Sequence, residues 1–529
     1  MNETCMDGIT KRIRAAVSRF DAVIFGSAFL MTLLVHLYMF TNKFINHDDV
    51  QGLYDDCAFG LSSGRFSLHL MSGLTGKFSS PWLNGVLGAL FLALTVTVFL
   101  KIFEIRHYPT ALLTAFVMVT VPTVVSTYTY MFCAWQYFFA MATACVGAWC
   151  IRHEKLPWMA AGAALIAFGM GCYQSYFGFA AAILVTVLIL DLCRNRWEGR
   201  ALPCLLTGIK YVVSLAAAMA LYFIILKVCL AVTGTVLTDY QGISGMGQIT
   251  PGMLLSRIGD AYVRFGAYFF CSEAYDDPVF TTVLACLCMA AGLFGVILSA
   301  IREKLHRHPG SLVLLIVLVL LFPLSCNLAY VMTDWKNVHM VMVYPLVMLY
   351  LLPAFTAEHF PVKREKGENG TDAHTAIPRA WEKTLVCLML VLTLLVGYEC
   401  AVTANAAYFA MDMTYENVYA FYTKLTAKIE MMPGFTRETP VVLFGKAVPD
   451  GFFSGPDITG VLVGKPAFNV YSRFQLLYYF IGCNYRFVPS EHREALKQTE
   501  TYAYMPCYPD EGSIQWIDGV IVVKLSQEY

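Results

Sequence analysis

Two pairs of adjacent carboxylates lie in the polar loop that follows the first long apolar stretch of the chain. Asp48 and Asp49 form the first pair, and Asp55 and Asp56 form the second. Charge is costly at the edge of a bilayer, where a lipid phosphate lies within reach, so four carboxylates at this position indicate a function. A carboxylate can also accept a proton from a hydroxyl group during group transfer. We therefore expect the loop over residues 41–80 to carry the chemistry of a membrane-embedded sugar transferase.

The same loop contains a cation suited to phosphate. Arg65 has a planar guanidinium that can contact a phosphate through two parallel hydrogen bonds. In a sugar transfer, Asp49 or Asp48 would be the general base, the other carboxylate would orient it, and Arg65 would bind the donor phosphate. The alternative is a solvated loop whose acids balance its basic residues. Further candidates for phosphate or substrate binding in later loops are Arg257, Arg264 and Lys336.

Aromatic residues in two other loops allow two interpretations. The turn Tyr173-Gln174-Ser175-Tyr176 and the pair Trp335 and Lys336 are predicted on the same side as loop 41–80. Their rings either anchor the chain in the membrane interface or stack on a sugar, with Tyr173, Gln174 and Tyr176 binding substrate. His36, inside the first apolar stretch, is expected to pack and to bond a neighbouring helix.

The elements that position these residues are predicted to be membrane-spanning helices. The chain has 529 residues, of which 58% are hydrophobic and 14% charged, and apolar runs of roughly 20 residues recur along it. This composition predicts a mainly α polytopic membrane protein with about eleven spans. Uncharged stretches over 109–151 and 159–190 should each cross twice, with turns at 128–130 and 173–176. The other spans are expected near 21–40, 204–230, 279–300, 311–328, 339–356 and 384–403, with one more between loop 41–80 and Lys101.

Lys and Arg residues are concentrated at one side of this arrangement, which predicts its orientation. The N-terminus (residues 1–20) and the polar segment 358–382 should be cytoplasmic, and loop 41–80 extracytoplasmic. The transferase domain would span residues 21–403, and a small extracytoplasmic α/β domain would follow over 404–529. Its expected elements are helices at 415–431 and 470–481 and strands at 439–444 and 519–525.

Several other chemistries lack sequence support. We find no phosphate-binding Gly-rich loop and no HExxH motif, and the zero net charge gives no argument for a nucleic-acid partner. The cytoplasmic segments are too short for a nucleotide-binding domain, which favours a lipid-linked donor. Most cysteines lie within apolar runs, and only Cys483 and Cys507 are placed where a disulfide is conceivable. We expect no cofactor and no metal site, although paired carboxylates leave Mg²⁺ or Mn²⁺ open.

Five short motifs in order along the chain resemble the bacterial GtrII-type glucosyltransferases. They are Asn46-His47-Asp48-Asp49, Ser63-Gly64-Arg65-Phe66, Gly171-Cys172-Tyr173-Gln174-Ser175-Tyr176, Asn405-Ala406-Ala407-Tyr408 and Met413-Thr414-Tyr415-Glu416. Each is weak alone, and the ordered set within a matching topology is more specific.

The resemblance implies a GT-C-like transferase in the bacterial inner or plasma membrane, with its site on the extracytoplasmic face. It implies a polyprenyl-phosphate sugar as donor, typically undecaprenyl-phosphate glucose, and a surface glycan such as O-antigen as acceptor. It also implies an acidic pair in the first external loop, which corresponds to Asp48 and Asp49. The rival interpretations are a transporter or lipid flippase, and a non-catalytic subunit of a glycan assembly complex. Transporters usually place ionisable groups within their spans, whereas the acids of this chain gather in loops.

Overall fold

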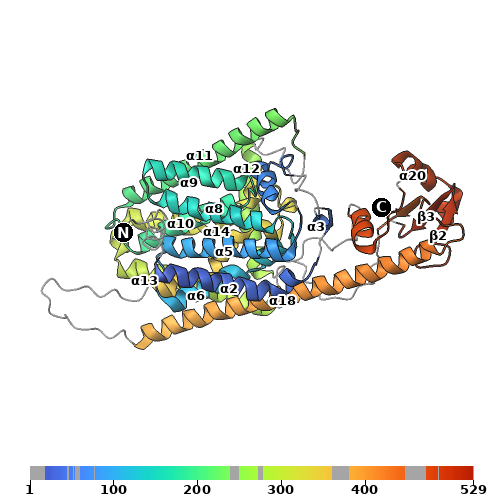
Figure 1. Cartoon of the computed structure of the whole chain (residues 1–529). Coiled ribbons are helices and arrows are strands. Elements are labelled where there is room, and N and C mark those ends of the chain that lie inside the picture. Colours follow the sequence, from blue (N-terminus) through green and yellow to red (C-terminus); the bar gives the residue numbers. More distant parts are fainter. Residues whose placement is uncertain are drawn as a thin grey trace, which may run out of the picture.

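A computed structural model describes residues 18–44, 47–51, 53, 60–76, 78–238, 250–271, 278–359, 380–446, 472–486 and 488–527. It is mainly helical, with one small sheet (Figure 1). The predicted residues Asp55 and Asp56 and the N-terminal residues 1–17 lie outside the described ranges.

Eight of the described helices are long and apolar enough to cross a membrane, and a bent pair brings the number to nine. A multi-pass helical membrane protein is therefore confirmed, whereas the described helices supply fewer regular spans than the eleven expected. The eight are α2 (Arg19–Thr41), α5 (Pro81–Ile102), α8 (Ala134–Arg152), α10 (Tyr176–Cys193), α11 (Ala201–Thr233), α13 (Pro278–Arg302), α14 (Pro309–Cys326) and α18 (Ala380–Glu430).

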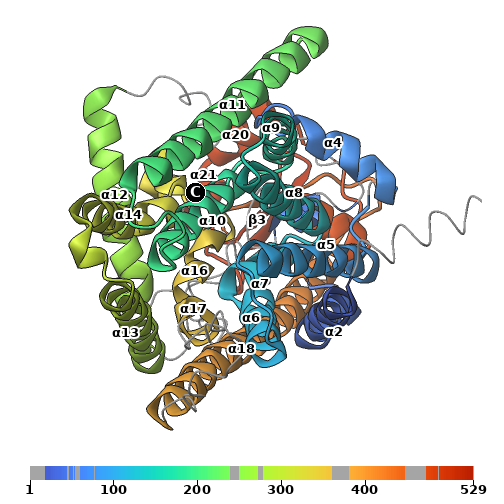
Figure 2. The ribbon, with the colours of Figure 1, turned by 90° about the vertical axis from the view of Figure 1, so that its left-hand side faces the viewer.

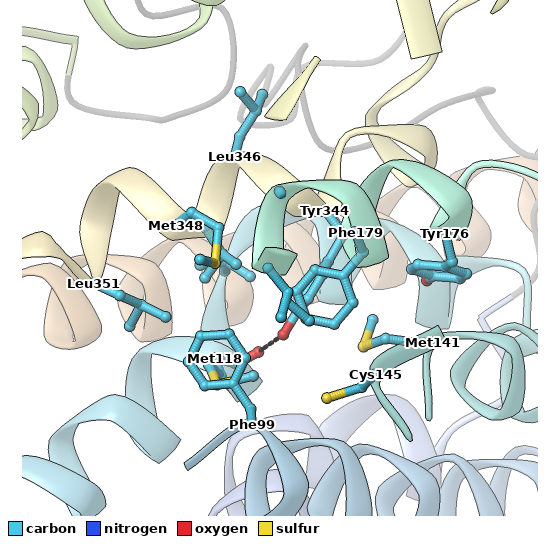
Figure 3. Close-up of a cluster of buried hydrophobic side chains, with 14 of the residues drawn as sticks. Phe99, Met118, Met141, Cys145, Tyr176, Phe179, Tyr344, Leu346, Met348 and Leu351 are labelled. Atoms are coloured by element: carbon cyan, nitrogen blue, oxygen red, sulfur yellow. Dashed lines mark hydrogen bonds between the residues drawn. The ribbon is translucent and has the colours of Figure 1, made fainter. Parts of the chain in front are cut away.

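The bent pair consists of α6 (Tyr108–Thr120) and α7 (Pro122–Thr129), which meet at 43°. Pro122 has no N–H to donate to the carbonyl of Met118, four residues earlier. The hydroxyl of Tyr344 donates to that carbonyl instead, at 3.1 Å (Figure 3). His36 Nε2 donates to the next carbonyl, that of Val119, at 2.9 Å. The break is thus stabilised by neighbouring segments, and the expected packing role of His36 is confirmed.

Two helices joined by a turn are found where the sequence predicted a double crossing over 159–190. The shorter apolar helix α9 (Leu156–Met170) is followed by the turn 171–175 and then by α10. The prediction of one continuous span over 339–356 is wrong. That segment forms short pieces, namely η5 (Met340–Met342), η6 (Tyr344–Leu346), α16 (Val347–Tyr350) and α17 (Leu352–His359). Pro345 and Pro353 interrupt the helix, and residues 341–351 are almost all buried, so this segment fills the bundle interior (Figure 2).

The remaining helical elements of the bundle lie near its ends. They are α3 (His47–Gln51), α4 (Phe66–Ser72), η1 (Gly73–Thr75), α12 (Pro251–Phe270), η3 (Leu305–Arg307), α15 (Ala329–Met332) and η4 (Trp335–Asn337). Figure 1 places α3 at one end of the bundle, beyond the end of α2. The beginning of α18 lies at the opposite end.

A network of ion pairs ties helices together at that opposite end. Glu104, between α5 and α6, lies 2.9 Å from Arg152 and 3.0 Å from Arg194. Burial alone would raise the pKa of Glu104, but the charges of these two arginines outweigh it and hold the pKa below its usual value. Asp191 pairs with Arg196 at 2.6 Å. The network joins α5, α8 and α10.

The last helix is longer than predicted. We expected a span ending near residue 403 and a separate helix from 415, whereas α18 is one helix of 51 residues, about 75 Å long at 1.5 Å per residue. It runs along the bundle, extends beyond it, and carries the sheet at its far end (Figure 1).

The sheet beyond α18 has the order β1-β3-β2. Strands β1 (Val441–Phe444) and β3 (Val520–Lys524) are parallel and fall where strands were predicted, whereas β2 (Ile514–Ile517) was missed. The aromatic helix expected over 470–481 is found as α19 (Arg473–Leu476), which continues as the π-helical η7 (Leu477–Ile481). Two further short helices are α20 (Ser490–Lys497) and α21 (Glu500–Tyr504).

Candidate active site

Asp49 is a fully buried carboxylate at the end of the bundle where α3 lies. Its Oδ2 is 2.8 Å from Lys43 Nζ. Its Oδ1 accepts hydrogen bonds from Ser79 Oγ at 2.5 Å and from the backbone N–H of Phe132 at 3.0 Å. The donors come from the end of α2, the start of α5 and the segment just before α8. Asp49 therefore anchors α3 to three parts of the bundle.

Asp48 occupies a different environment on the same short helix. Successive helical residues point about 100° apart, and Asp48 is half-buried where Asp49 has no exposed surface. The structure therefore separates the two carboxylates that the sequence left equivalent. Asp49 faces the bundle and is held by these donors, whereas part of the surface of Asp48 remains exposed.

Arg65 lies against a pair of stacked tyrosines. The Tyr137 and Tyr173 rings have centroids 4.0 Å apart and an interplanar angle of 17°. Arg65 Nη1 donates to Tyr137 Oη at 3.0 Å, and its guanidinium carbon lies 5.2 Å from the Tyr173 ring centroid. Hydrogen bonding and cation–π attraction both fix the guanidinium. The structure thus brings together two predicted site residues, Arg65 and Tyr173.

Hydrogen bonds attach the backbone around Arg65 to the 171–176 turn and to α11. Gln174 Nε2 donates to the carbonyl of Ser63 at 2.9 Å and to Tyr222 Oη at 3.1 Å. The Tyr222 hydroxyl in turn donates to the carbonyl of Gly64 at 2.9 Å. Gly64 has a φ of +76°, and a Cβ there would lie 2.7 Å from the Tyr222 oxygen, so this turn requires glycine.

The tyrosine and glutamine side chains of the predicted turn are buried rather than exposed to a substrate or to the membrane surface. Tyr173 and Tyr176 are each 2% exposed and Gln174 is 8% exposed, so their side chains pack inside the bundle. This burial fits neither anchors in the membrane interface nor rings that are free to stack on a sugar. Tyr222, in α11, was missed because a tyrosine inside a long apolar helix has no local sequence signal.

The three later cations lie in a second cluster. The guanidinium carbon of Arg264 lies 3.9 Å from the centroid of the Trp335 ring, and Lys336 Nζ lies 5.8 Å from it. Arg257 Nη1 donates to the carbonyls of Val331 and Met332, at 3.4 and 3.3 Å. Arg264 therefore already covers one face of the ring that we considered as a sugar-stacking platform.

No group of three His, Cys, Asp or Glu side chains converges on a metal-sized site within the ranges that the structure describes. Asp55 and Asp56 lie outside those ranges. Cys483 and Cys507 are both free thiols, so the conceivable disulfide is not formed.

Asp49 and Arg65 are connected through the start of one helix. Asp49 accepts from the N–H of Phe132 and Arg65 donates to Tyr137, on either side of the N-terminus of α8. The N-terminus of a helix carries partial positive charge, which stabilises the carboxylate and favours anions. Fold and site together define a multi-pass helical membrane protein that presents acidic and cationic groups at one end of its bundle.

The particular family follows from comparison with known proteins. The sequence model of the glucosyl transferase GtrII family matches residues 37–350, and the chain belongs to this family. The family name indicates a glucosyltransferase, as the resemblance of the motifs predicted. The match contains α3, Arg65 and the 171–176 turn, whereas α18 and the sheet lie beyond it. Neither a curated protein nor a solved structure matches the chain.

Proposed function

We propose that this protein transfers glucose from a polyprenyl phosphate, such as undecaprenyl-phosphate glucose, to a cell-envelope polysaccharide such as O-antigen. The reaction takes place on the extracytoplasmic face of the bacterial inner membrane, at the end of the bundle that carries α3. Membership of the GtrII family supports glucosyl transfer. The apolar helices support a lipid-linked donor, whose phosphate would lie at the membrane surface.

In the proposed mechanism, Asp48 is the general base. The acceptor hydroxyl oxygen attacks C1 of glucose, its proton passes to Asp48, and the bond between C1 and the phosphate oxygen breaks. The products are the glucosylated glycan and polyprenyl phosphate. Asp49 takes no proton in this scheme, because it holds α3 in place through Lys43, Ser79 and Phe132.

Arg65 neutralises the negative charge that develops on the leaving phosphate. The stacked tyrosines hold its guanidinium in one orientation before substrate binds, so no reorganisation is needed during the reaction. The observation that supports the proposal is that Asp49 and Arg65 bond residues only five apart in the chain, Phe132 and Tyr137, at the start of α8.

The test is a donor comparison with the purified protein in liposomes. Radiolabelled polyprenyl-phosphate glucose and radiolabelled nucleotide glucose are offered separately, each with an envelope polysaccharide as acceptor. We expect label to reach the polysaccharide only from the lipid-linked donor. Transfer from the nucleotide sugar alone, or from neither donor with a folded protein, would contradict the proposal.

A further inference from the structure

Two consecutive residues of α3 are buried in different parts of the molecule. Asp49 is anchored to the bundle, as described above. Val50 is also fully buried, but it belongs to a separate hydrophobic cluster. The cluster also contains Val418, Tyr422 and Leu425 of α18 and Leu476 and Leu477 of α19 and η7.

The same cluster continues into the small sheet. It includes Val441 of β1 and Ile521 and Val523 of β3, so Val50 lies in the hydrophobic core of the C-terminal unit. Figure 1 shows α3 between the bundle and that unit. A helix of five residues is not stable by itself. Its position therefore depends on the ionic anchor on one side and the apolar contact on the other.

The C-terminal unit is held in a fixed position relative to the bundle by α18. At Gly397, a Cβ would lie 2.4 Å from the ring of Phe116, which shows how closely α18 packs on α6. Further along, the hydroxyl of Tyr38 in α2 donates to the carboxylate of Asp412 in α18. The helix continues without a break from these contacts to Val418, Tyr422 and Leu425.

We propose that the C-terminal unit positions α3 by packing around Val50, and that Val50 is a positioning residue for Asp48. This inference rests on the proposed function, because it takes Asp48 as the base. The residues that pack around Val50 in this cluster all lie beyond residue 350, outside the part of the chain that the family model matches. Transfer in this protein thus depends on α18 and the sheet as well as on the matched bundle.

The test compares Val50→Asp with Val50→Ile in the full-length protein, using hydrogen–deuterium exchange and transfer kinetics. We expect Val50→Asp to raise amide exchange in α3 at least about tenfold, because burial of a valine is worth at least that factor in an equilibrium constant. The same variant should lower kcat, because Asp48 loses its support. KM for the donor should change little, because Arg65 is untouched. Val50→Ile should behave as the wild type. Val50→Ala should change amide exchange and kcat in the same directions as Val50→Asp, but by smaller factors.

A reciprocal variant, Leu425→Asp, perturbs the cluster from the α18 side and should also speed exchange in α3. Unchanged exchange in β3 would show that the sheet is still folded in Val50→Asp. Wild-type exchange of α3 in Val50→Asp, or faster exchange with undiminished kcat, would overturn the inference. If the wild type transfers no sugar at all, the proposed function fails, whereas the exchange data still decide whether Val50 holds α3.

Discussion

Replacement of Asp49 by asparagine should release Lys43 and α3 from the bundle. In the wild type, Lys43 Nζ lies 2.8 Å from Asp49 Oδ2, and the side chains are 24% and 0% exposed. Asparagine keeps one oxygen for Ser79 and the N–H of Phe132, but its NH₂ group cannot accept from Lys43. Lys43 Nζ then loses its anionic partner and keeps only its bonds to the hydroxyl and the carbonyl of Ser79, at 2.7 and 3.2 Å.

The size of this effect follows from the burial of the pair. Removing one partner of a buried ion pair costs about 3–5 kcal/mol, and a hydrogen bond to a charged group contributes about 1.5–3 kcal/mol. Lys43 is a quarter exposed, so water recovers part of the loss. We expect about 2–3 kcal/mol, which increases the population of the locally open state by about 30–150-fold.

Limited trypsin digestion can report this opening, because trypsin cleaves after Lys43. When opening is fast relative to cleavage, the cleavage rate follows the population of the open state. The fragment beginning at Phe44 should therefore appear about 30–150-fold faster for Asp49→Asn than for the wild type. Membrane insertion should be intact, and transfer should fall as the fraction of molecules with α3 in place falls.

The adjacent variant Asp48→Asn is the matched control, because it leaves the Lys43–Asp49 pair in place. Its cleavage rate after Lys43 should stay near that of the wild type. Cleavage of Asp49→Asn at the wild-type rate would refute the anchoring role of Asp49. Equal acceleration in both variants would refute the separation of roles between the two carboxylates.

Three further variants test other parts of the structure. Arg65→Lys keeps the charge but loses the planar group held by the tyrosine pair, so kinetics with the lipid-linked donor should show a lower kcat/KM by at least about tenfold. Tyr344→Phe leaves the carbonyl of Met118 without this donor, which should lower the free energy of unfolding by about 1–3 kcal/mol. The midpoint of thermal unfolding should therefore fall. Glu104 has a folded-state pKa below its usual value of 4.5, so its stabilising contribution is complete above that pH and is lost as the pH falls through the folded value. Glu104→Gln should therefore lower the thermal midpoint at pH 7, and the midpoint of the variant should fall less than that of the wild type as the pH is lowered. The same pH dependence in both proteins would contradict the pairing of Glu104 with the arginines.

Sequence reasoning predicted features that depend on local signals. The apolar helix α2, the two helices joined by a turn within 156–193 and the strands β1 and β3 were all found, because uncharged runs and β-branched residues act within their own segments. The boundary expected near residue 403 was misplaced for a physical reason. The change from apolar to polar residues there marks where α18 leaves the bundle, and a helix can continue into water without a break.

Features that depend on distant partners could not be predicted in this way. Burial in the bundle interior and exposure to lipid both require apolar side chains, so the segment 339–356 resembled a span. Asp48 and Asp49 looked equivalent in the sequence, and the bonds of Asp49 to Ser79 and Phe132 come from residues far along the chain. The apolar partners of Val50 are several hundred residues away in the chain, and no short motif contains both.

The most direct test of the central claim is the transfer activity of Asp48→Asn in liposomes with radiolabelled polyprenyl-phosphate glucose. A general base contributes about 10²–10⁴-fold to the rate, so kcat should fall by at least about a hundredfold while donor binding and the trypsin rate after Lys43 stay close to wild type. Wild-type transfer by Asp48→Asn would contradict the assignment of Asp48 as the base and, with it, the proposed chemistry of the loop.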